Sequence, residues 1–304
     1  MAHDHDHGDD RHGHGHSHDH GDLDWAALAP HLEAEAELYT PLYERALAWL
    51  GKKQTEPGLV VDAGSGPGVI SALLAEAFPG ARVVAVDAAQ PLLERALDRA
   101  EKRGVADRFS VLAGELPGVL DDLEYPADLI WASNSLHHLG DQRAGLTALA
   151  ARLAPGGTLA VLEGGLPVRF LPRDTGIGRP GFQDRLDVAR ADWFAEMRAA
   201  LPGAVDVPED WPDLLAAAGL RPTGTRSFLL DVPPPATDRA RACLVSTLTR
   251  VREACADRLD ATDTATLDRL LDPDDRASLH HRRDVFFLTA RTVHTATRID
   301  APPR

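Results

Sequence analysis

The sequence has few of the features that mark secreted or membrane proteins. Its 304 residues include only two cysteines, Cys243 and Cys255. The two lie 12 residues apart in one expected helix, which turns them to different faces, so we expect free thiols and no disulfide. No apolar run is long enough to cross a membrane, and the polar N-terminus is unlike a signal peptide. We therefore expect a cytoplasmic protein.

Basic residues are also scarce relative to acidic ones. Lys and Arg number 32 against 47 Asp and Glu, so the formal net charge is −15 with neutral histidines. A surface of this sign repels the phosphates of nucleic acids and the anionic surface of a membrane. We therefore expect a small-molecule partner, with no nucleic acid and no membrane. The sequence leaves the oligomeric state open, with a homodimer among the alternatives.

Residues 1–22 form a tail of low complexity that is rich in His and Asp. The tail has almost no apolar side chains to offset its ordering entropy, so we expect it to be disordered. Imidazoles flanked by carboxylates bind Ni²⁺, Zn²⁺ or Cu²⁺, so adventitious metal binding is one interpretation and a solubilising tail is the other. The candidate metal ligands are His3, His5, His7, His12, His14, His16, His18 and His20.

After the tail, apolar patterns alternate between helix and strand. A helical pattern covers residues 23–50. Strands are expected at residues 59–61, 82–86, 109–112, 129–132 and 158–162, with helices at 69–78, 91–103 and 141–153 between them. Further helices are expected at 184–201, 211–218 and 237–281, and further strands at 225–232 and 284–297. This alternation predicts an α/β fold with a mostly parallel sheet covered by helices on both faces.

A glycine-rich loop, residues 62–68, joins the first expected strand to its helix. Its sequence, Asp-Ala-Gly-Ser-Gly-Pro-Gly, permits a tight turn and lets a ligand approach the backbone beside a helix N-terminus. The dinucleotide-binding fingerprint is G-x-G-x-x-G, with a wider last gap than the G-x-G-x-G found here. A nicotinamide oxidoreductase, which would bind NADH, is therefore the less favoured interpretation.

Together with four later segments, this loop resembles the class I S-adenosylmethionine-dependent methyltransferases. The segments cover residues 84–87, 112–115, 128–139 and 153–159, in the family's order and spacing over residues 59–163. The resemblance implies S-adenosylmethionine as cofactor and a Rossmann-like, seven-stranded, mostly parallel sheet whose last strand is antiparallel. It also implies that Asp87 binds the ribose hydroxyls and that Glu115 faces the adenine. The family often has Asp at the position of Glu115 or just after it. The candidate cofactor-binding residues are Asp62, Gly64, Ser65, Gly66, Gly68, Asp87, Ala88, Gly114, Glu115, Ser133 and Asn134.

On this basis we divide the chain into the tail and one methyltransferase domain, residues 23–304. The domain would comprise an N-terminal helical segment (23–57), a cofactor-binding half (58–163) and two helical, substrate-side insertions (164–209 and 234–283). Arg169, Arg173, Arg179 and Arg185 give the first insertion local positive charge. They suggest a carboxylate-bearing acceptor, but a solvated loop whose arginines pair with nearby Asp is the favoured interpretation.

Methyl transfer from a sulfonium needs mainly alignment of the reactants, with a general base where the acceptor holds its proton tightly. His137 and His138 follow the fourth expected strand and are the candidate bases, although they could simply shape the loop. We therefore predict an enzyme that methylates a small molecule, with a role in secondary metabolism suggested. The alternative is a methyltransferase-fold binding protein without transfer activity, with metal bound by the tail.

Overall fold

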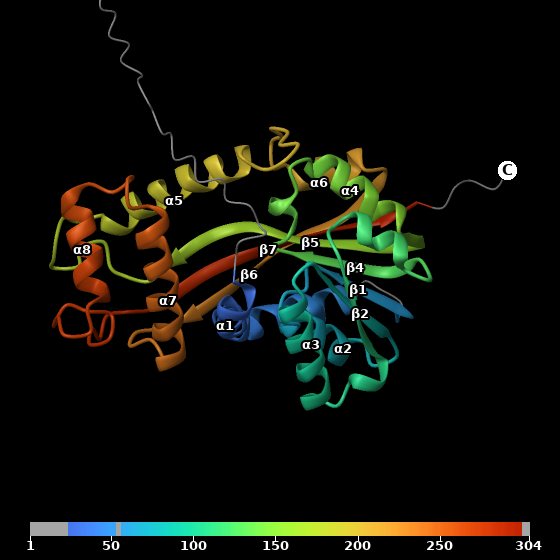
Figure 1. Cartoon of the computed structure of the whole chain (residues 1–304), viewed down its shortest axis with the longest axis horizontal. Helices are drawn as coiled ribbons and strands as arrows, with labels where there is room; N and C mark the ends of the chain where they lie inside the picture. Colours follow the sequence, from blue (N-terminus) through green and yellow to red (C-terminus); the bar gives the residue numbers. More distant parts are fainter. Residues whose placement is uncertain (1–23, 53–55, 300–304) are drawn as a thin grey trace, which may run out of the picture.

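Seven strands make up the sheet of the computed structural model, which describes residues 24–52 and 56–299 (Figure 1). The strands are β1 (Leu59–Ala63), β2 (Arg82–Asp87), β3 (Phe109–Ala113), β4 (Ala127–Ser133), β5 (Leu153–Arg169), β6 (Leu220–Val232) and β7 (Phe287–Arg298). Their order across the sheet is β3-β2-β1-β4-β5-β7-β6. β7 pairs antiparallel with both β5 and β6, and the other neighbours pair in parallel. The predicted Rossmann-like sheet with an antiparallel last strand is therefore confirmed.

Helices cover both faces of this sheet, because each face is apolar and must be buried. α1 (Trp25–Gly51), α2 (Val69–Ala77) and α3 (Gln90–Lys102) contribute to the apolar core on one face. α4 (Gln142–Ala151) and α6 (Trp211–Ala217) bury their apolar sides on the other face. The remaining helices, α5 (Phe182–Ala199), α7 (Asp238–Ala254) and α8 (Ala261–Leu271), group at one end of the sheet (Figure 1).

Several predicted boundaries were wrong because strand pairing overrides local propensity. β5 begins at Leu153 and runs to Arg169, beyond the predicted 158–162, since β7 continues to pair with it past Gly165. The first insertion therefore begins as a strand. β6 likewise starts at Leu220, five residues before its predicted start, because β7 supplies hydrogen-bond partners there as well. The helical stretch predicted at 237–281 is two separate helices, α7 and α8.

Both insertions leave the sheet at the edge where the parallel strands end. β5 and β6 run in the same direction as β1, β2 and β4, so the segments after Arg169 and Val232 begin at the carboxyl edge. β7 then starts from that edge at Phe287. In an open α/β sheet this edge is where ligands bind. The helical group of α5, α7 and α8 is thus next to the expected ligand site.

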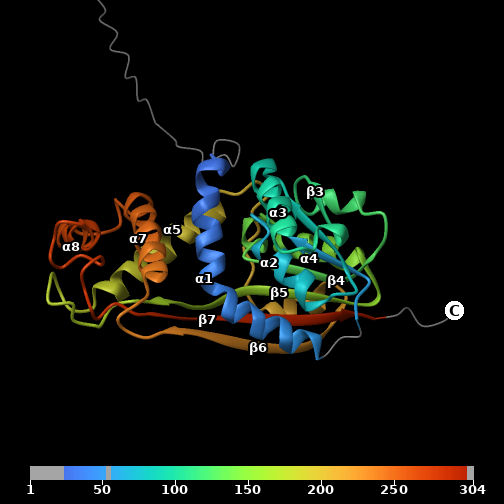
Figure 2. The same cartoon turned by 90° about the horizontal axis from the view of Figure 1, so that it is seen from below.

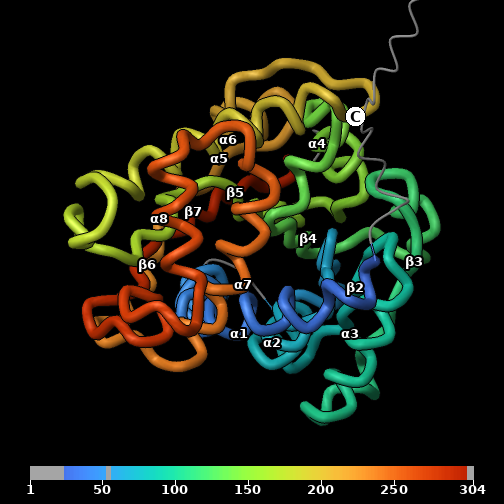
Figure 3. The backbone as a smooth tube through the Cα atoms, turned by 60° about the vertical axis from the view of Figure 1, so that its left-hand side comes forward, coloured from blue at the N-terminus to red at the C-terminus, as the bar shows by residue number. Residues whose placement is uncertain are grey.

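α1 lies between α7 and the α2–α3 pair (Figure 2 and Figure 3). Its first turns pack Ala29 against Ala89 and Leu92, close to the end of β2. Ion pairs of 2.8 Å between Arg95 and Glu33 and 3.1 Å between Arg99 and Glu37 fasten it to α3. These contacts of its N-terminal half hold α1 beside the carboxyl edge of the sheet.

The fold also bears on the two cysteines and on the prediction that no segment crosses a membrane. Cys243 lies in α7, Cys255 directly follows its last residue, and both are buried free thiols, as predicted. None of the helices in the described part of the chain is long and apolar enough to span a membrane. The division at residues 57, 163, 209 and 283 stays a prediction.

Candidate functional site

The glycine-rich loop is held against β2 by backbone hydrogen bonds. The amides of Gly64 and Ser65 both donate to the carbonyl of Val86, each at 2.9 Å. The amide of Gly68 donates back to the carbonyl of Ser65 at 3.2 Å, which closes the turn before α2. The loop is thus a fixed feature of the carboxyl edge, formed by its own main chain.

Packing explains two of the three loop glycines, and the third faces open space. All three have positive φ, 81° at Gly64, 53° at Gly66 and 73° at Gly68. A Cβ at Gly64 would lie 2.4 Å from the Cβ of Ser135, and one at Gly68 would lie 2.5 Å from the Cβ of Ala96. A Cβ at Gly66 would meet nothing within 4 Å. Gly66 is therefore the position where a ligand can come closest to the loop backbone.

The carboxylate of Asp87, at the end of β2, organises the neighbouring main chain. One oxygen accepts the amide of Gly66 at 2.8 Å and the other accepts the amide of Ala89 at 2.9 Å. Burial raises the pKa of Asp87, and these backbone donors oppose that rise. Its carbonyl also accepts the amide of Gly114, at 3.0 Å, so the ends of β2 and β3 are joined. Ala88, between these contacts, is exposed.

The other predicted cofactor residues lie along the same edge. Glu115 is exposed just after β3. Ser133 ends β4 and is 7% exposed, whereas Asn134 after it is exposed and has a φ of 49°. The amide of Asn134 donates to the carbonyl of Leu162 at 3.0 Å, which ties the end of β4 to β5. All these assignments to the cofactor stay predictions, but the fold brings the residues to one edge.

Asp62 lies beneath the loop and not on its surface. It is 1% exposed, and the hydroxyl of Ser71 donates to its carboxylate at 2.5 Å. Burial raises the pKa of Asp62 to about 7, although the hydrogen bond from Ser71 opposes the rise. Asp62 therefore supports the loop from below, and a direct contact with a ligand would require the loop to move.

This burial predicts how stability depends on pH. The folded pKa of about 7 exceeds the ordinary value of 3.8, so the folded state binds more protons than the unfolded state between pH 4 and pH 7. The contribution of Asp62 to the unfolding free energy therefore falls as pH rises through this window and stays constant above it. We expect the unfolding free energy of the parent to drop by roughly 2–3 kcal/mol more than that of Asp62→Asn between pH 5 and pH 8, measured by urea unfolding. Asp122→Asn, at an exposed acid, should keep the parent's pH profile, and parallel profiles for the parent and Asp62→Asn would contradict the expectation.

Glu163, which the sequence analysis did not single out, is buried directly after the end of the β4–β5 pairing. It is 5% exposed, and one of its oxygens accepts the amides of Ser135 and Leu136 at 2.9 and 2.8 Å. The other oxygen lies 3.1 Å from Nδ1 of His137. Glu163 directly follows the expected strand at 158–162, so an acid at a strand end is the signal that could have found it.

The short turn that carries the two candidate histidines, Leu136–His138, is thus held from both sides. Opposite Glu163, the guanidinium of Arg198 in α5 donates to the carbonyls of His137 and Leu139, both at 2.6 Å. The ring of His137 also lies 5.5 Å from that of Phe194 and 4.2 Å from that of His138. The side chain of His137 is 19% exposed, whereas His138 is exposed. Because Glu163 faces Nδ1, the structure orients the ring of His137.

The arginines of the first insertion mostly pair with aspartates, as the favoured interpretation expected. Arg169 lies 2.6 Å from Asp184, and Arg185 lies 2.6 Å from Asp263 of α8. Arg179 also pairs with Asp263, at 2.9 Å. The two pairs with Asp263 join the first insertion to the second. The local positive charge is therefore used within the protein, and these three arginines give no support to a carboxylate site in that loop.

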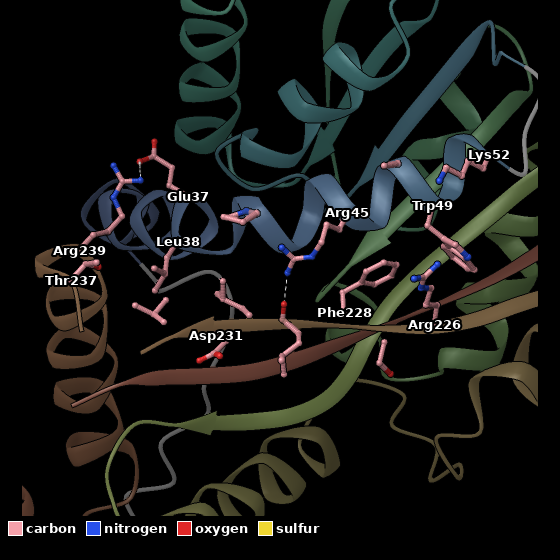
Figure 4. Close-up of a pocket in the computed structure, with 16 residues that line it drawn as sticks. Glu37, Leu38, Arg45, Trp49, Lys52, Arg226, Phe228, Asp231, Thr237 and Arg239 are labelled. Carbon is pink, nitrogen blue, oxygen red and sulfur yellow. Dashed lines mark hydrogen bonds and ion pairs between the residues drawn. The ribbon is translucent and has the colours of Figure 1, made fainter. Parts of the chain in front are cut away.

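A groove of about 870 Å³ lies elsewhere, between α1 and the edge strand β6 (Figure 4). None of the candidate site residues lines it. Arg45 reaches across from α1 and donates to the carbonyl of Leu229, and Arg226 lies over the ring of Phe228. Charged side chains over an unpaired strand edge protect it against pairing with other chains. We therefore interpret the groove as a covered sheet edge.

The predicted metal ligands in residues 1–22 lie outside the described residues. Over residues 24–52 and 56–299, no group of three or more His, Cys, Asp or Glu side chains is placed to hold a metal ion. Metal binding by the tail stays a prediction.

Comparison with known proteins agrees with the geometry of this edge. A family described as a methyltransferase domain matches residues 61–159. Methyltransferase GfsG from Streptomyces halstedii is 34% identical over 200 residues, which cover 65% of this chain and 63% of that protein. Trans-aconitate 2-methyltransferase from Paracidovorax citrulli is 38% identical over 102 residues, 34% of this chain and 37% of the relative. The tRNA 5-carboxymethoxyuridine methyltransferase of Escherichia coli K12 is 33% identical over 119 residues, 39% of this chain and 44% of the relative.

These alignments span less than two thirds of each relative, and the two shorter ones span less than half. Among solved structures, an O-methyltransferase family protein from Burkholderia thailandensis matches 88% of this chain and 58% of its own, with a TM-score of 0.50 and 15% identity. At that identity the likeness supports the fold alone. The family match covers the glycine-rich loop, Asp87, Glu115 and the turn of His137. Residues 61–159 therefore match a methyltransferase domain, and over this part the chain is similar to the class I S-adenosylmethionine-dependent methyltransferases.

Proposed function

We propose that the protein transfers a methyl group from S-adenosylmethionine to a small-molecule acceptor in the cytoplasm. The observation that carries the proposal is the arrangement at the carboxyl edge, where the glycine-rich loop, Asp87 and Glu115 follow three adjacent strands. The net charge of −15 supports a small molecule over a nucleic acid, although one relative is named for a tRNA substrate. A role in secondary metabolism stays a prediction.

The residues of the edge fit the cofactor. A carboxylate has about four acceptor sites, and the amides of Gly66 and Ala89 occupy two at Asp87, with the amide of Ala88 also close, so acceptor capacity remains for a ribose hydroxyl. The exposed Glu115 lies after β3, which is the strand next to β2, where the adenine would extend from the ribose. The open space at Gly66 leaves room for the ligand against the loop. When bound, S-adenosylmethionine supplies an activated methyl group on its sulfonium.

His137 is the base that we propose for an acceptor that must lose a proton. If Nδ1 carries its hydrogen toward the carboxylate of Glu163, the lone pair of the neutral ring is at Nε2, which can then take a proton from a hydroxyl or amine. Glu163 does not touch the acceptor in this scheme. It acts as a positioning residue because it fixes the turn and the tautomer of His137.

Calorimetry with the full chain tests the cofactor directly. We expect S-adenosylmethionine and its demethylated product S-adenosylhomocysteine to bind with micromolar dissociation constants, and NADH not to compete. Binding should be followed by release of S-adenosylhomocysteine when an acceptor from a small-molecule screen is supplied. Failure of both cofactor forms to bind at millimolar concentration would refute the proposal. Binding without transfer to small molecules or tRNA would favour the binding-protein alternative.

A further inference from the structure

A polar cluster lies between α1, α7 and β7, on the face of the sheet that α1 covers. Its members come from segments far apart in the sequence and form no part of the cofactor edge described above. They are His31, Glu35, Tyr39, Ser246, Arg250 and Arg291. Polar groups in such a position are normally fully hydrogen-bonded, because leaving one without a partner costs free energy.

Arg291 is the member whose hydrogen bonding is incomplete. Its guanidinium lies 5.4 Å from the ring centre of Tyr39, and Nη2 makes a long contact of 3.5 Å with the Tyr39 hydroxyl. Nε is buried and has no hydrogen-bond partner among the described residues. Nε and Nη2 form one edge of the guanidinium, and that edge matches the two oxygens of a carboxylate. The described residues therefore give this edge of the guanidinium only one long hydrogen bond.

The cluster also has more positive than negative charge. Burial opposes ionisation of Glu35, but the nearby ring of His31 and the charges of Arg250 and Arg291 outweigh it and hold the pKa of Glu35 below its ordinary value. Glu35 is therefore ionised at neutral pH. His31 accepts a hydrogen bond from Arg250 at Nε2 and is bonded to Ser246 at Nδ1, 2.7 Å away. The charges of two guanidinium groups thus act on one carboxylate, so the cluster has a net positive charge that a second anion would balance.

The cluster borders the end of the sheet where methyl transfer would occur. Arg291 pairs in register with Gly165, two residues after Glu163 on β5. Tyr39 stacks on Tyr43 one helical turn along α1, with ring centres 6.1 Å apart. Tyr43 in turn lies close to the side chain of Ser133, the last residue of β4. A continuous row of contacts therefore joins the Arg291 guanidinium to the end of β4.

We propose that Arg291, assisted by the Tyr39 hydroxyl, binds a carboxylate group of the methyl acceptor. This inference rests on the proposed function and adds a substrate class to it. A bound carboxylate would give Nε its missing partner and replace the long contact at Nη2 with a charged hydrogen bond. Since Arg291 pairs with Gly165, two residues from Glu163, the same acceptor could place a second group near His137.

Calorimetry on the protein saturated with S-adenosylhomocysteine tests the site. The probes are benzoate, succinate and citrate, each compared with its methyl ester and with sulfate at equal ionic strength. We expect at least one carboxylate to bind the parent, its ester to bind at least 10-fold more weakly, and Arg291→Gln to lose at least 10-fold in affinity. Tyr39→Phe should lose about 10-fold, in line with one hydrogen bond to a charged group. Arg291→Lys, which keeps the charge, should retain part of the affinity even if the Gln variant folds poorly.

Arg226→Gln is the matched control. Its guanidinium also lies 5.4 Å from an aromatic ring centre, that of Phe228 on the edge strand, but outside the cluster. It should bind every probe as the parent does. The inference would be overturned if the parent bound no carboxylate, if Arg291→Gln bound it as tightly as the parent, or if the esters bound as tightly as the acids. The proposed function would survive each of these results as long as S-adenosylhomocysteine itself binds.

Discussion

Replacing His137 by alanine is expected to lower the turnover number by about 100-fold or more, while the dissociation constant of S-adenosylmethionine changes less than twofold. A positioned general base contributes typically 10²–10⁴-fold to a rate, whereas binding of the cofactor does not require it. The measurement is the rate of S-adenosylhomocysteine release with any acceptor that the parent methylates. Added imidazole should restore part of the rate in the variant, because the free base can occupy the vacated space.

The neighbouring histidine supplies the matched control for this prediction. His138→Ala alters the same turn but not the ring that faces Glu163, so we expect a loss of less than 5-fold. Equal losses in the two variants would mean that the turn is needed only for its shape. An unchanged turnover in His137→Ala would remove the base from the mechanism.

The Glu163→Gln variant tests whether Glu163 acts by orienting the ring of His137. The amide keeps one oxygen for the backbone amides of Ser135 and Leu136, but its NH₂ group would face Nδ1 of His137. Such a donor favours the tautomer with hydrogen on Nε2, which cannot act as the base. We expect turnover to fall by about 10-fold or more with a normal melting temperature, and ¹⁵N chemical shifts to report the change of tautomer. A purely structural role for Glu163 would lower the melting temperature and leave the tautomer unchanged.

The part of the site that could be predicted from the sequence is the part built from local main chain. The glycine-rich loop and Asp87 lie within 25 residues of each other, and their spacing follows from one strand-turn-helix unit and the strand after it. Their positive φ values and tight packing explain why these residue types occur there. The strand ends are then brought together by parallel pairing, which the alternation of helix and strand predicts.

The contacts that could not be predicted depend on elements far apart in the chain. Glu163 reaches His137 only because β4 and β5 are neighbours with a defined register. Tyr39 and Arg291 are 252 positions apart, and their contact depends on where α1 crosses β7. The same holds for the length of β5, whose extension to Arg169 is stabilised by pairing with β7 and not by its own Gly- and Pro-containing sequence.

Replacing Asp87 by alanine is expected to weaken the binding of S-adenosylmethionine and S-adenosylhomocysteine by about 100-fold. The variant loses the acceptors proposed for the ribose hydroxyls, and hydrogen bonds to a charged group contribute roughly 1.5–3 kcal/mol each. It also frees the amides of Gly66 and Ala89, which the carboxylate now holds. A loss of about 3 kcal/mol corresponds to the expected change in the dissociation constant, measured by calorimetry.

Asp128→Ala distinguishes loss of the cofactor contact from general damage to the fold. Asp128 likewise accepts two backbone amides, those of Gly58 and Leu59 at 2.8 and 2.9 Å, but at the opposite edge of the sheet, where β1 and β4 begin. Both variants should lower the melting temperature by a few degrees, because each leaves two amides without their carboxylate. Only Asp87→Ala should lose affinity for the cofactor, and Asp87→Asn, which keeps one acceptor oxygen, should lie between it and the parent. An Asp87→Ala variant that binds as tightly as the parent would show that the ribose lies elsewhere, and the assignment of the whole edge would have to be revised with it.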